Sequence, residues 1–271
     1  WNLLTNWRHY LNYIIGMAIG LSLITLTNIG SGTRLEEIGA DWGLSDTDVM
    51  VHTLGNFFPF IAFIFCFAMT AYIFANMGTK LQRETFMLLP GSNAEKYLSR
   101  LLLATVGAAV QFGIAVVVAD AVQALAGLFL HPDFHPSLTL ATIKSIGQKP
   151  LIGIALGNDV ICQILLSQVS TAAVVLFSSS FAVLGGTIFR KQPAVITGSI
   201  WLALIIGATY VLAQMLLTGV PEHMPMLDVQ DMNWITIAIS AVVTIIAAIN
   251  YWLSYRIFCR MQVIGNKWIN L

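Results

Sequence analysis

The chain has 271 residues, of which 57% are hydrophobic and only 10% are charged. Soluble domains carry about 25% charged residues, so this composition excludes a soluble enzyme, a nucleic-acid-binding protein and a disordered chain. It indicates an integral membrane protein surrounded by lipid. The 13 basic and 13 acidic residues cancel, and charge is therefore informative only through its distribution along the chain.

Residues 1–10 have the spacing of an amphipathic helix that lies at the membrane interface before the first span. Five residues follow helical spacing: Trp1, Leu4, Trp7, Arg8 and Leu11. Trp together with Arg is normal at an interface. The segment lacks the pattern of a secretory signal, and because the chain starts at Trp1 rather than Met, we expect that a few N-terminal residues are missing.

Six long apolar segments predict six transmembrane helices, since about 20 apolar residues are needed to cross a core of roughly 30 Å. The segments are continuously apolar, which favours helices over the alternating strands of a barrel. In chain order they cover residues 10–29, 54–75, 97–130, 160–184, 194–217 and 234–257. The predicted fold class is therefore an all-α integral membrane protein, with residues 1–271 forming a single six-span domain.

The first span contains Gly16 and Gly20, a Gly-x-x-x-Gly pair. Small residues at this spacing let two helix backbones approach closely. The pair could pack within the chain or against a second copy, and the spacing leaves both alternatives open.

The basic residues indicate the orientation. With both termini inside, the inner segments hold ten of the 13 basic residues: Arg8, Lys80, Arg83, Lys96, Arg100, Arg190, Lys191, Arg256, Arg260 and Lys267. The outer loops hold Arg34, Lys144 and Lys149. This asymmetry follows the positive-inside rule and predicts that both termini are cytoplasmic.

The loop over residues 76–96 is the most informative part of the chain. Residues 85–89 form an apolar patch framed by charges, and Pro90-Gly91 is a turn signal. Ser92 and Glu95 have the spacing of a capping box that opens the third span. The loop therefore predicts a short helix, a turn and a new helix. Its apolar patch is either a docking surface or the buried side of a helix lying flat in the lipid interface.

The string RETFMLLPGSNAEKYL at positions 83–98 resembles the first-inner-loop signature of type 2 ABC exporter permeases, particularly those of Bacteroides-type bacteria. The resemblance implies a six-span permease without its own ATPase, which begins with an amphipathic elbow helix, here residues 1–10, on the inner face. It also implies that the helix before Pro90 is a coupling helix that sits in a groove of a separate ATPase subunit. The expected docking residues are Arg83, Glu84, Phe86, Leu88, Leu89, Pro90, Ser92, Glu95 and Lys96.

Polar side chains within the spans are candidates for a translocation path. They are Gln111, Gln163, Ser167, Thr171, Ser240 and Thr244. The fourth and sixth spans place theirs on one helix face, with Ser170 and Thr236 alongside. Hydrogen bonding between helices is the other interpretation of such faces.

The remaining candidates for chemistry are few. No P-loop string is present, so the chain cannot bind ATP by that route, and the energy for any energised work would come from a partner or an ion gradient. The resemblance implies ATP and Mg on a partner subunit and no cofactor on this chain. Asp120 is predicted to lie near the outer membrane boundary, either as an interfacial carboxylate or as a proton or substrate site. His131 and His135 flank prolines and predict a plain turn rather than a metal site. The three cysteines, Cys66, Cys162 and Cys259, lie far apart and predict neither disulfides nor a metal site.

The leading hypothesis is the membrane subunit of an ABC exporter in a bacterial inner membrane, paired with a second permease copy or a sister permease and driven by a separate ATPase. A non-transporting anchor or sensor is the alternative, and an ion-coupled transporter that uses Asp120 ranks third. An intramembrane hydrolase is weaker still, because no catalytic constellation falls at membrane depth.

Overall fold

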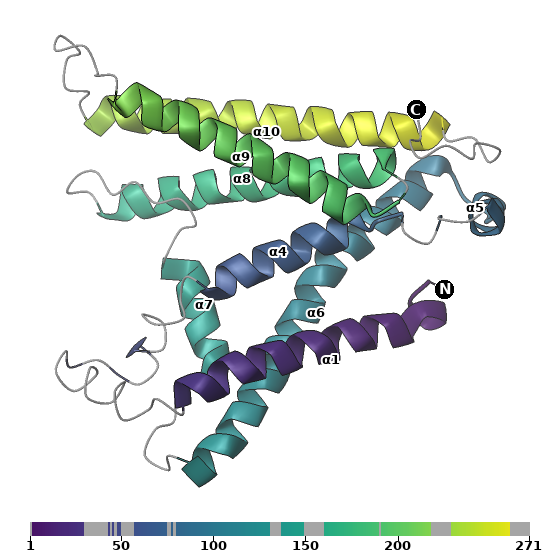
Figure 1. The fold of residues 1–271 in the computed structure, drawn as a ribbon. Coiled ribbons are helices and arrows are strands. Elements are labelled where there is room, and N and C mark those ends of the chain that lie inside the picture. Colours follow the sequence, from purple (N-terminus) through teal and green to yellow (C-terminus); the bar gives the residue numbers. More distant parts are fainter. Residues whose placement is uncertain are drawn as a thin grey trace. The chain divides into compact units, whose positions relative to one another are not determined.

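The computed structural model describes residues 2–29, 43, 45, 48–49, 57–74, 77, 80–130, 137–148, 160–189, 191–217 and 229–260. Its regular elements are all helices, which confirms the predicted all-α class (Figure 1). In chain order they are α1 (Asn2–Ile29), α4 (Phe57–Ala71), α5 (Lys80–Met87), α6 (Asn93–Leu130), α7 (Leu138–Gln148), α8 (Val160–Ile188), α9 (Pro193–Leu217) and α10 (Val229–Arg260).

Five of these helices are long and apolar enough to cross a membrane. The qualifying segments are Tyr10–Thr27, Asn93–Phe129, Gln168–Ile188, Pro193–Val211 and Trp234–Arg260. Each corresponds to one of the predicted spans, and the chain is therefore a multi-pass helical membrane protein. The sixth predicted span, 54–75, corresponds to α4, which has 15 residues and a length of about 22 Å at about 1.5 Å per residue. Residues 54–56 and 75 lie outside the described residues, so a crossing by this segment stays a prediction.

The N-terminal segment does not form a helix of its own. A single helix, α1, runs unbroken over 28 residues from Asn2 to Ile29. The expected boundary near residue 10 between an elbow and a span is not marked by any break. At about 1.5 Å per residue, α1 is about 42 Å long and exceeds a core of roughly 30 Å. An interfacial position of its first turns stays a prediction.

The chain forms two compact units. Unit 1 comprises Trp1–Phe65 and Val106–Leu151, and unit 2 comprises Cys66–Thr105 and Ile152–Leu271. Two helices are shared, because α4 passes into unit 2 after Phe65 and α6 passes into unit 1 after Thr105.

The core of unit 1 is built around alanines on one face of α6. Small side chains there let α1, α4 and α7 pack closely, as in other membrane bundles. The phenyl rings of Phe65 and Phe112 face each other beside the core with centroids 6.4 Å apart. The buried members are Ala18, Leu21, Phe58, Phe112, Ala115, Val116, Ala119, Leu138 and Ala141.

In unit 2, two glycines near the end of α8 set the closest helix contacts. A Cβ atom at Gly185 would overlap the side chain of Thr197 at the start of α9. A Cβ atom at Gly186 would overlap the backbone carbonyl oxygen of Ala71 at the end of α4. Hydrogen is therefore the only side chain at these positions that lets the three helices come together.

We expect Gly186→Ala to destabilise the detergent-solubilised protein, because the added methyl group meets backbone that cannot rotate away. Such overpacking costs about 1–3 kcal/mol, although alanine is otherwise the better helix former by roughly 0.5–1 kcal/mol. The measurement is the thermal unfolding midpoint. Gly207→Ala in α9 is the matched control, since a Cβ there meets nothing within 4 Å. Equal midpoints for the two variants would contradict the packing described.

Candidate functional site

The turn after α5 has the predicted capping box. The amide of Ser92 donates to Glu95 Oε2 at 2.9 Å, and the amide of Glu95 donates to Ser92 Oγ at 3.3 Å. Each side chain thus satisfies a donor at the start of α6 that has no partner within the helix. Gly91 has φ +138°, a backbone conformation that favours glycine. The predicted sequence of short helix, turn and new helix is confirmed.

The eight-residue helix α5 presents an apolar face outward. Leu81 is 73% exposed and Leu88 is 82% exposed. The amide of Leu88 still donates to Glu84 O at 3.0 Å, so Leu88 continues the helical hydrogen bonding and shares one face with Leu81 at i+7. Thr85 lies between them at i+4, and its hydroxyl donates to Leu81 O at 2.8 Å. Because that hydroxyl is bonded within the helix, the face offers chiefly apolar surface.

The opposite side of α5 is anchored by Phe86, which is only 7% exposed. Its ring meets Phe258 of α10 edge-on, with centroids 6.4 Å apart. The guanidinium carbon of Arg100 in α6 lies 4.7 Å from the Phe86 ring centroid, within the range of a cation–π interaction. Phe86 therefore joins α5 to two spanning helices at once.

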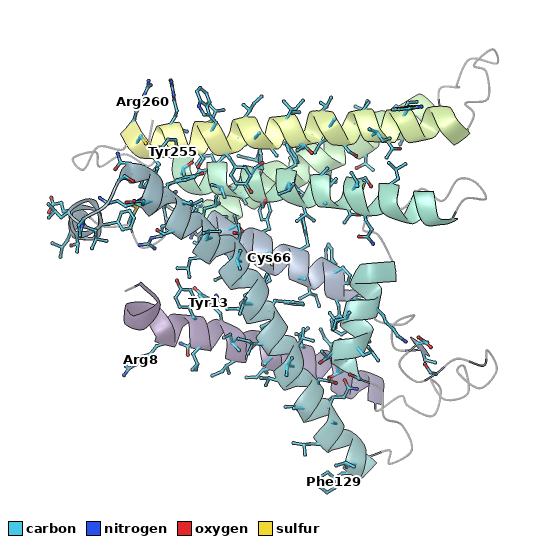
Figure 2. All side chains as sticks on the ribbon, turned by 180° about the vertical axis from the view of Figure 1, so that it is seen from behind. Arg8, Tyr13, Cys66, Phe129, Tyr255 and Arg260 are labelled. Carbon is cyan, nitrogen blue, oxygen red and sulfur yellow. The ribbon has the colours of Figure 1, made fainter. Side chains whose placement is uncertain are left out.

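Phe258 is the centre of an aromatic cluster, defined here as Phe74, Phe86, Tyr97, Tyr255 and Phe258. Phe258 stacks on Phe74 at 5.1 Å and lies 5.8 Å from Tyr97, while Tyr97 meets Tyr255 edge-on at 5.4 Å. These distances are typical of favourable aromatic pairs. Within unit 2, α5 lies at the end of α10 that carries Tyr255 and Arg260 (Figures 1 and 2).

The expected docking residues differ in their exposure. Leu88, Pro90, Ser92 and Glu95 are exposed. Phe86, by contrast, is buried in the cluster, and Leu89 packs against the cluster, so these two side chains face the spans. Glu84 and Lys96 are half-buried and interact within the chain, whereas the Arg83 side chain lies outside the described residues.

Sequence reasoning missed Leu81, the second exposed leucine of α5. The predicted apolar patch consists of consecutive residues, 85–89, whereas a helix presents residues at i, i+4 and i+7 on one face. At that spacing Leu81, Thr85 and Leu88 share one face of the helix, and the packing of Phe86 on the other side decides that this face is exposed.

The candidate path residues have different surroundings. In α10, Ser240 donates to Thr236 O and Thr244 donates to Ser240 O, each at 2.8 Å, so both hydroxyls are bonded within their own helix. Gln111 Oε1 and Thr171 Oγ1 are buried and have no hydrogen-bond partner among the described residues. Gln163 and Ser167 have side chains outside the described residues, and a translocation path stays a prediction.

Other residues make the polar contacts between α8 and α10. Ser179 Oγ and Tyr251 Oη lie 2.7 Å apart, and Asn250 Nδ2 donates to Ser180 Oγ at 3.3 Å. The sequence signal was available, because three consecutive serines interrupt an apolar helix at 178–180 and an amide interrupts another at Asn250. Interhelical hydrogen bonds of this kind contribute about 0.6 kcal/mol each.

Asp120 has a structural role in unit 1. Its carboxylate accepts from the amide of Leu138 at 2.7 Å, and from the amide and hydroxyl of Thr139 at 3.2 and 2.6 Å. The hydroxyl of Ser137 adds a fourth donor at 3.1 Å. Asp120 in α6 thus caps the first turn of α7 in the way that an N-cap side chain does.

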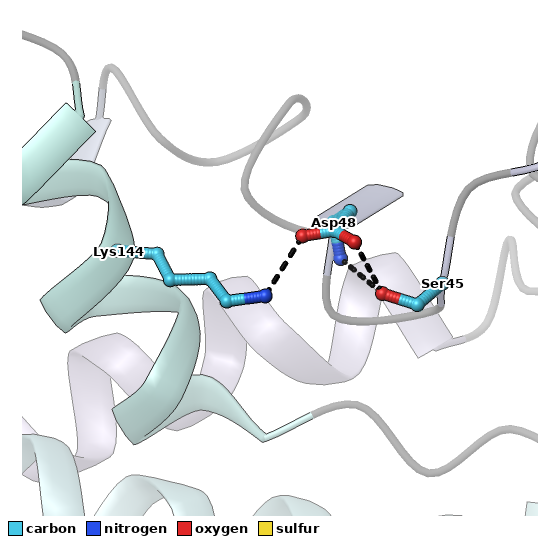
Figure 3. Close-up of polar contacts among 3 residues, drawn as sticks. All are labelled: Ser45, Asp48 and Lys144. Carbon is cyan, nitrogen blue, oxygen red and sulfur yellow. Dashed lines mark hydrogen bonds and ion pairs between the residues drawn. The ribbon is translucent and has the colours of Figure 1, made fainter.

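A salt bridge holds the middle of α7 to the segment at residues 45–49. Lys144 Nζ lies 2.9 Å from Asp48 Oδ1, and Ser45 Oγ donates to Asp48 Oδ2 at 2.5 Å (Figure 3). About a third of each charged side chain is exposed, so the pair contributes at most about 1 kcal/mol.

The structure adds little support for the remaining sites predicted from the sequence. A Cβ atom at Gly16 or Gly20 would meet no described atom within 4 Å, so the described residues do not use this pair for packing. No group of three or more His, Cys, Asp or Glu side chains gathers in the described part of the chain. His131 and His135 lie outside it.

No protein-family model, curated protein or solved structure matches the chain.

We expect Asp120→Asn to loosen the first turn of α7, because the amide nitrogen of asparagine cannot accept the bonds that Asp120 Oδ2 receives. A cap is worth about 1 kcal/mol, so the amides of Leu138 and Thr139 should exchange about fivefold faster with deuterium. Glu95→Gln is the control, since it removes a capping carboxylate at the start of α6 and not of α7. Unchanged exchange in Asp120→Asn would remove the capping role.

Proposed function

We propose that the chain is the permease subunit of an ABC exporter and that α5 is the helix on which a separate ATPase docks. The proposal rests on the two faces of α5. One face is fastened to α6 and α10 through Phe86, and the other presents Leu81 and Leu88 at 73% and 82% exposure. The helix is thus fixed to the spans on one side and open to a partner on the other.

The exposed apolar face of α5 is better suited to binding in a groove of a partner protein than to lying in the lipid interface. An exposed apolar face on a polar loop typically marks a protein contact, and two leucines two turns apart can act as anchors for a helix in a groove. α5 is also as polar as a surface loop, because Lys80, Gln82, Arg83 and Glu84 make up half of its eight residues. ATP and Mg would be bound by the partner subunit.

The orientation follows from the charges at one end of unit 2. The aromatic cluster brings together α5, the start of α6 and the end of α10, which carry Arg83, Lys96, Arg256 and Arg260. Basic residues favour the cytoplasmic side, where ATP is available. In this proposal both termini are cytoplasmic, α4 completes the second of six spans, and the membrane is a bacterial inner membrane.

The transport cycle in this proposal is a shift between two states. ATP binding closes the partner ATPases, which displaces α5 and tilts the spans between inward-open and outward-open arrangements. Two permease copies, or this chain and a sister permease, would enclose the substrate path. The open Gly16 and Gly20 face of α1 is a candidate contact between them.

The two alternative functions can be distinguished from the exporter. The ion-coupled transporter needs Asp120 as a carrier, but that carboxylate already accepts four hydrogen bonds at the start of α7. The anchor or sensor shares ATPase docking with the exporter and differs in transport. Substrate-dependent ATP hydrolysis in a reconstituted complex would separate the two.

We expect Leu88→Asp to abolish recovery of the ATPase when the chain is co-expressed and purified with the products of its neighbouring genes. A carboxylate in an apolar groove is desolvated without a partner, and loss of a central anchor costs about 2 kcal/mol or more, so recovery should fall at least about tenfold. The measurement is the amount of co-purified ATPase per permease.

Gln192→Asp is the matched control, because Gln192 is exposed in the turn between α8 and α9 and its φ of 49° is one that Asp tolerates. The control should retain the ATPase. If the unmodified chain captures no ATPase that contains a P-loop, the proposed function is wrong.

A further inference from the structure

The contact between Phe86 and Phe258 joins parts of the chain that have no short covalent connection. α5 is linked through short loops to α4 and α6, so any displacement of α5 reaches those helices along the backbone. α10 follows much later in the sequence. Among the described residues of α5, only Phe86 makes a ring contact with α10, and that contact is made by Phe258.

The geometry of Phe86 restricts sliding. Arg100 lies over the face of its ring at 4.7 Å, while Phe258 meets the ring edge-on at an interplanar angle of 72°. If the Phe86 ring moves within its own plane or perpendicular to it, its contact with Phe258 or its contact with Arg100 is therefore disturbed. Phe258 is in turn only 1% exposed and is stacked on Phe74. Close-packed groups of this kind pass displacements on rather than absorb them.

From these contacts we infer that Phe258 is a positioning residue that transmits movement of α5 to the cytoplasmic end of α10. The inference rests on the proposed function only in that a docked ATPase supplies the movement. α10 is bonded to α8 through Ser179 with Tyr251 and through Asn250 with Ser180. A displacement of the α10 end is thus passed to a helix that has no aromatic contact with α5 among the described residues.

The test follows the end of α10 directly and needs no knowledge of the substrate. Nitroxide spin labels are placed on the native Cys259, which is exposed, and on Gln192→Cys in the exposed turn before α9, with Cys66 and Cys162 replaced by serine. The full chain in complex with its partner ATPase is reconstituted in lipid nanodiscs. The label-to-label distance is measured without nucleotide and after trapping with Mg-ATP and vanadate.

With Phe258 present, trapping should shift this distance by about 1–2 Å, the size of helix shifts at interfaces. Phe258→Leu removes the ring but keeps an apolar side chain, and it should reduce the shift by at least half while the ATPase stays bound. Phe258→Tyr keeps the ring and should restore the full shift. Trp252→Leu is the matched control, because it removes an exposed aromatic ring of α10 outside the cluster and should leave the shift unchanged.

The outcomes separate the two proposals. If no ATPase binds the unmodified chain, the proposed function fails. If the ATPase binds and the full shift persists in Phe258→Leu, or if Phe258→Tyr shifts no more than Phe258→Leu does, the role of Phe258 is refuted while docking stands. Should Phe258→Leu not fold, Phe258→Met, which has a similar volume and no ring, carries the same test.

Discussion

Burial of the Phe86 ring is the interaction on which the arrangement of the first loop depends. An isolated helix of eight residues is marginal in water, because nucleation is unfavourable and few hydrogen bonds follow it. Moving a phenylalanine out of water contributes about 1.5–3 kcal/mol, and Phe86 obtains this by inserting between Arg100 and Phe258. Among the described side chains of α5, that of Phe86 is the buried one, and it fastens the helix to the spans. Helical periodicity then directs Leu81 and Leu88 to the opposite side, where they remain exposed.

The interactions along the spans are different in kind. Lipid is as apolar as leucine, so helices gain little by burying apolar side chains against each other, and close backbone approach and hydrogen bonds decide the packing. Unit 2 shows both, with Gly185 and Gly186 at the meeting of α4, α8 and α9 and with the Ser179–Tyr251 pair between α8 and α10. The hydrogen bonds contribute about 0.6 kcal/mol each, and the aromatic cluster in addition joins α5 to α10.

The sequence predicted those features that depend on local chemistry or on composition. Five apolar segments form helices long enough to span, and Ser92 and Glu95 form their capping box, because both patterns act over a few neighbouring residues. The sequence did not predict that Phe86 faces inward while Leu81 faces outward. That choice is made by Phe258, a residue far along the chain, and no local pattern encodes which remote side chain will meet it. The hydroxyls of Ser240 and Thr244 are different, since they donate to carbonyl groups of their own helix, a local bond that serine and threonine commonly make in helices.

The role of Asp120 bears on the alternative of an ion-coupled transporter. A carboxylate that carries protons or ions must exchange its partners during a transport cycle. Both carboxylate oxygens of Asp120, however, accept hydrogen bonds from the first turn of α7. Releasing them would leave the donors of Ser137, Leu138 and Thr139 without these partners, and each unpaired group would cost about 1–3 kcal/mol. In the described spans the other charged side chains lie within a few turns of the helix ends. In the proposed exporter, the free energy for transport would therefore come from a partner subunit, and the outward face of α5, which is joined through Phe86 to the spans, is the surface that would receive it.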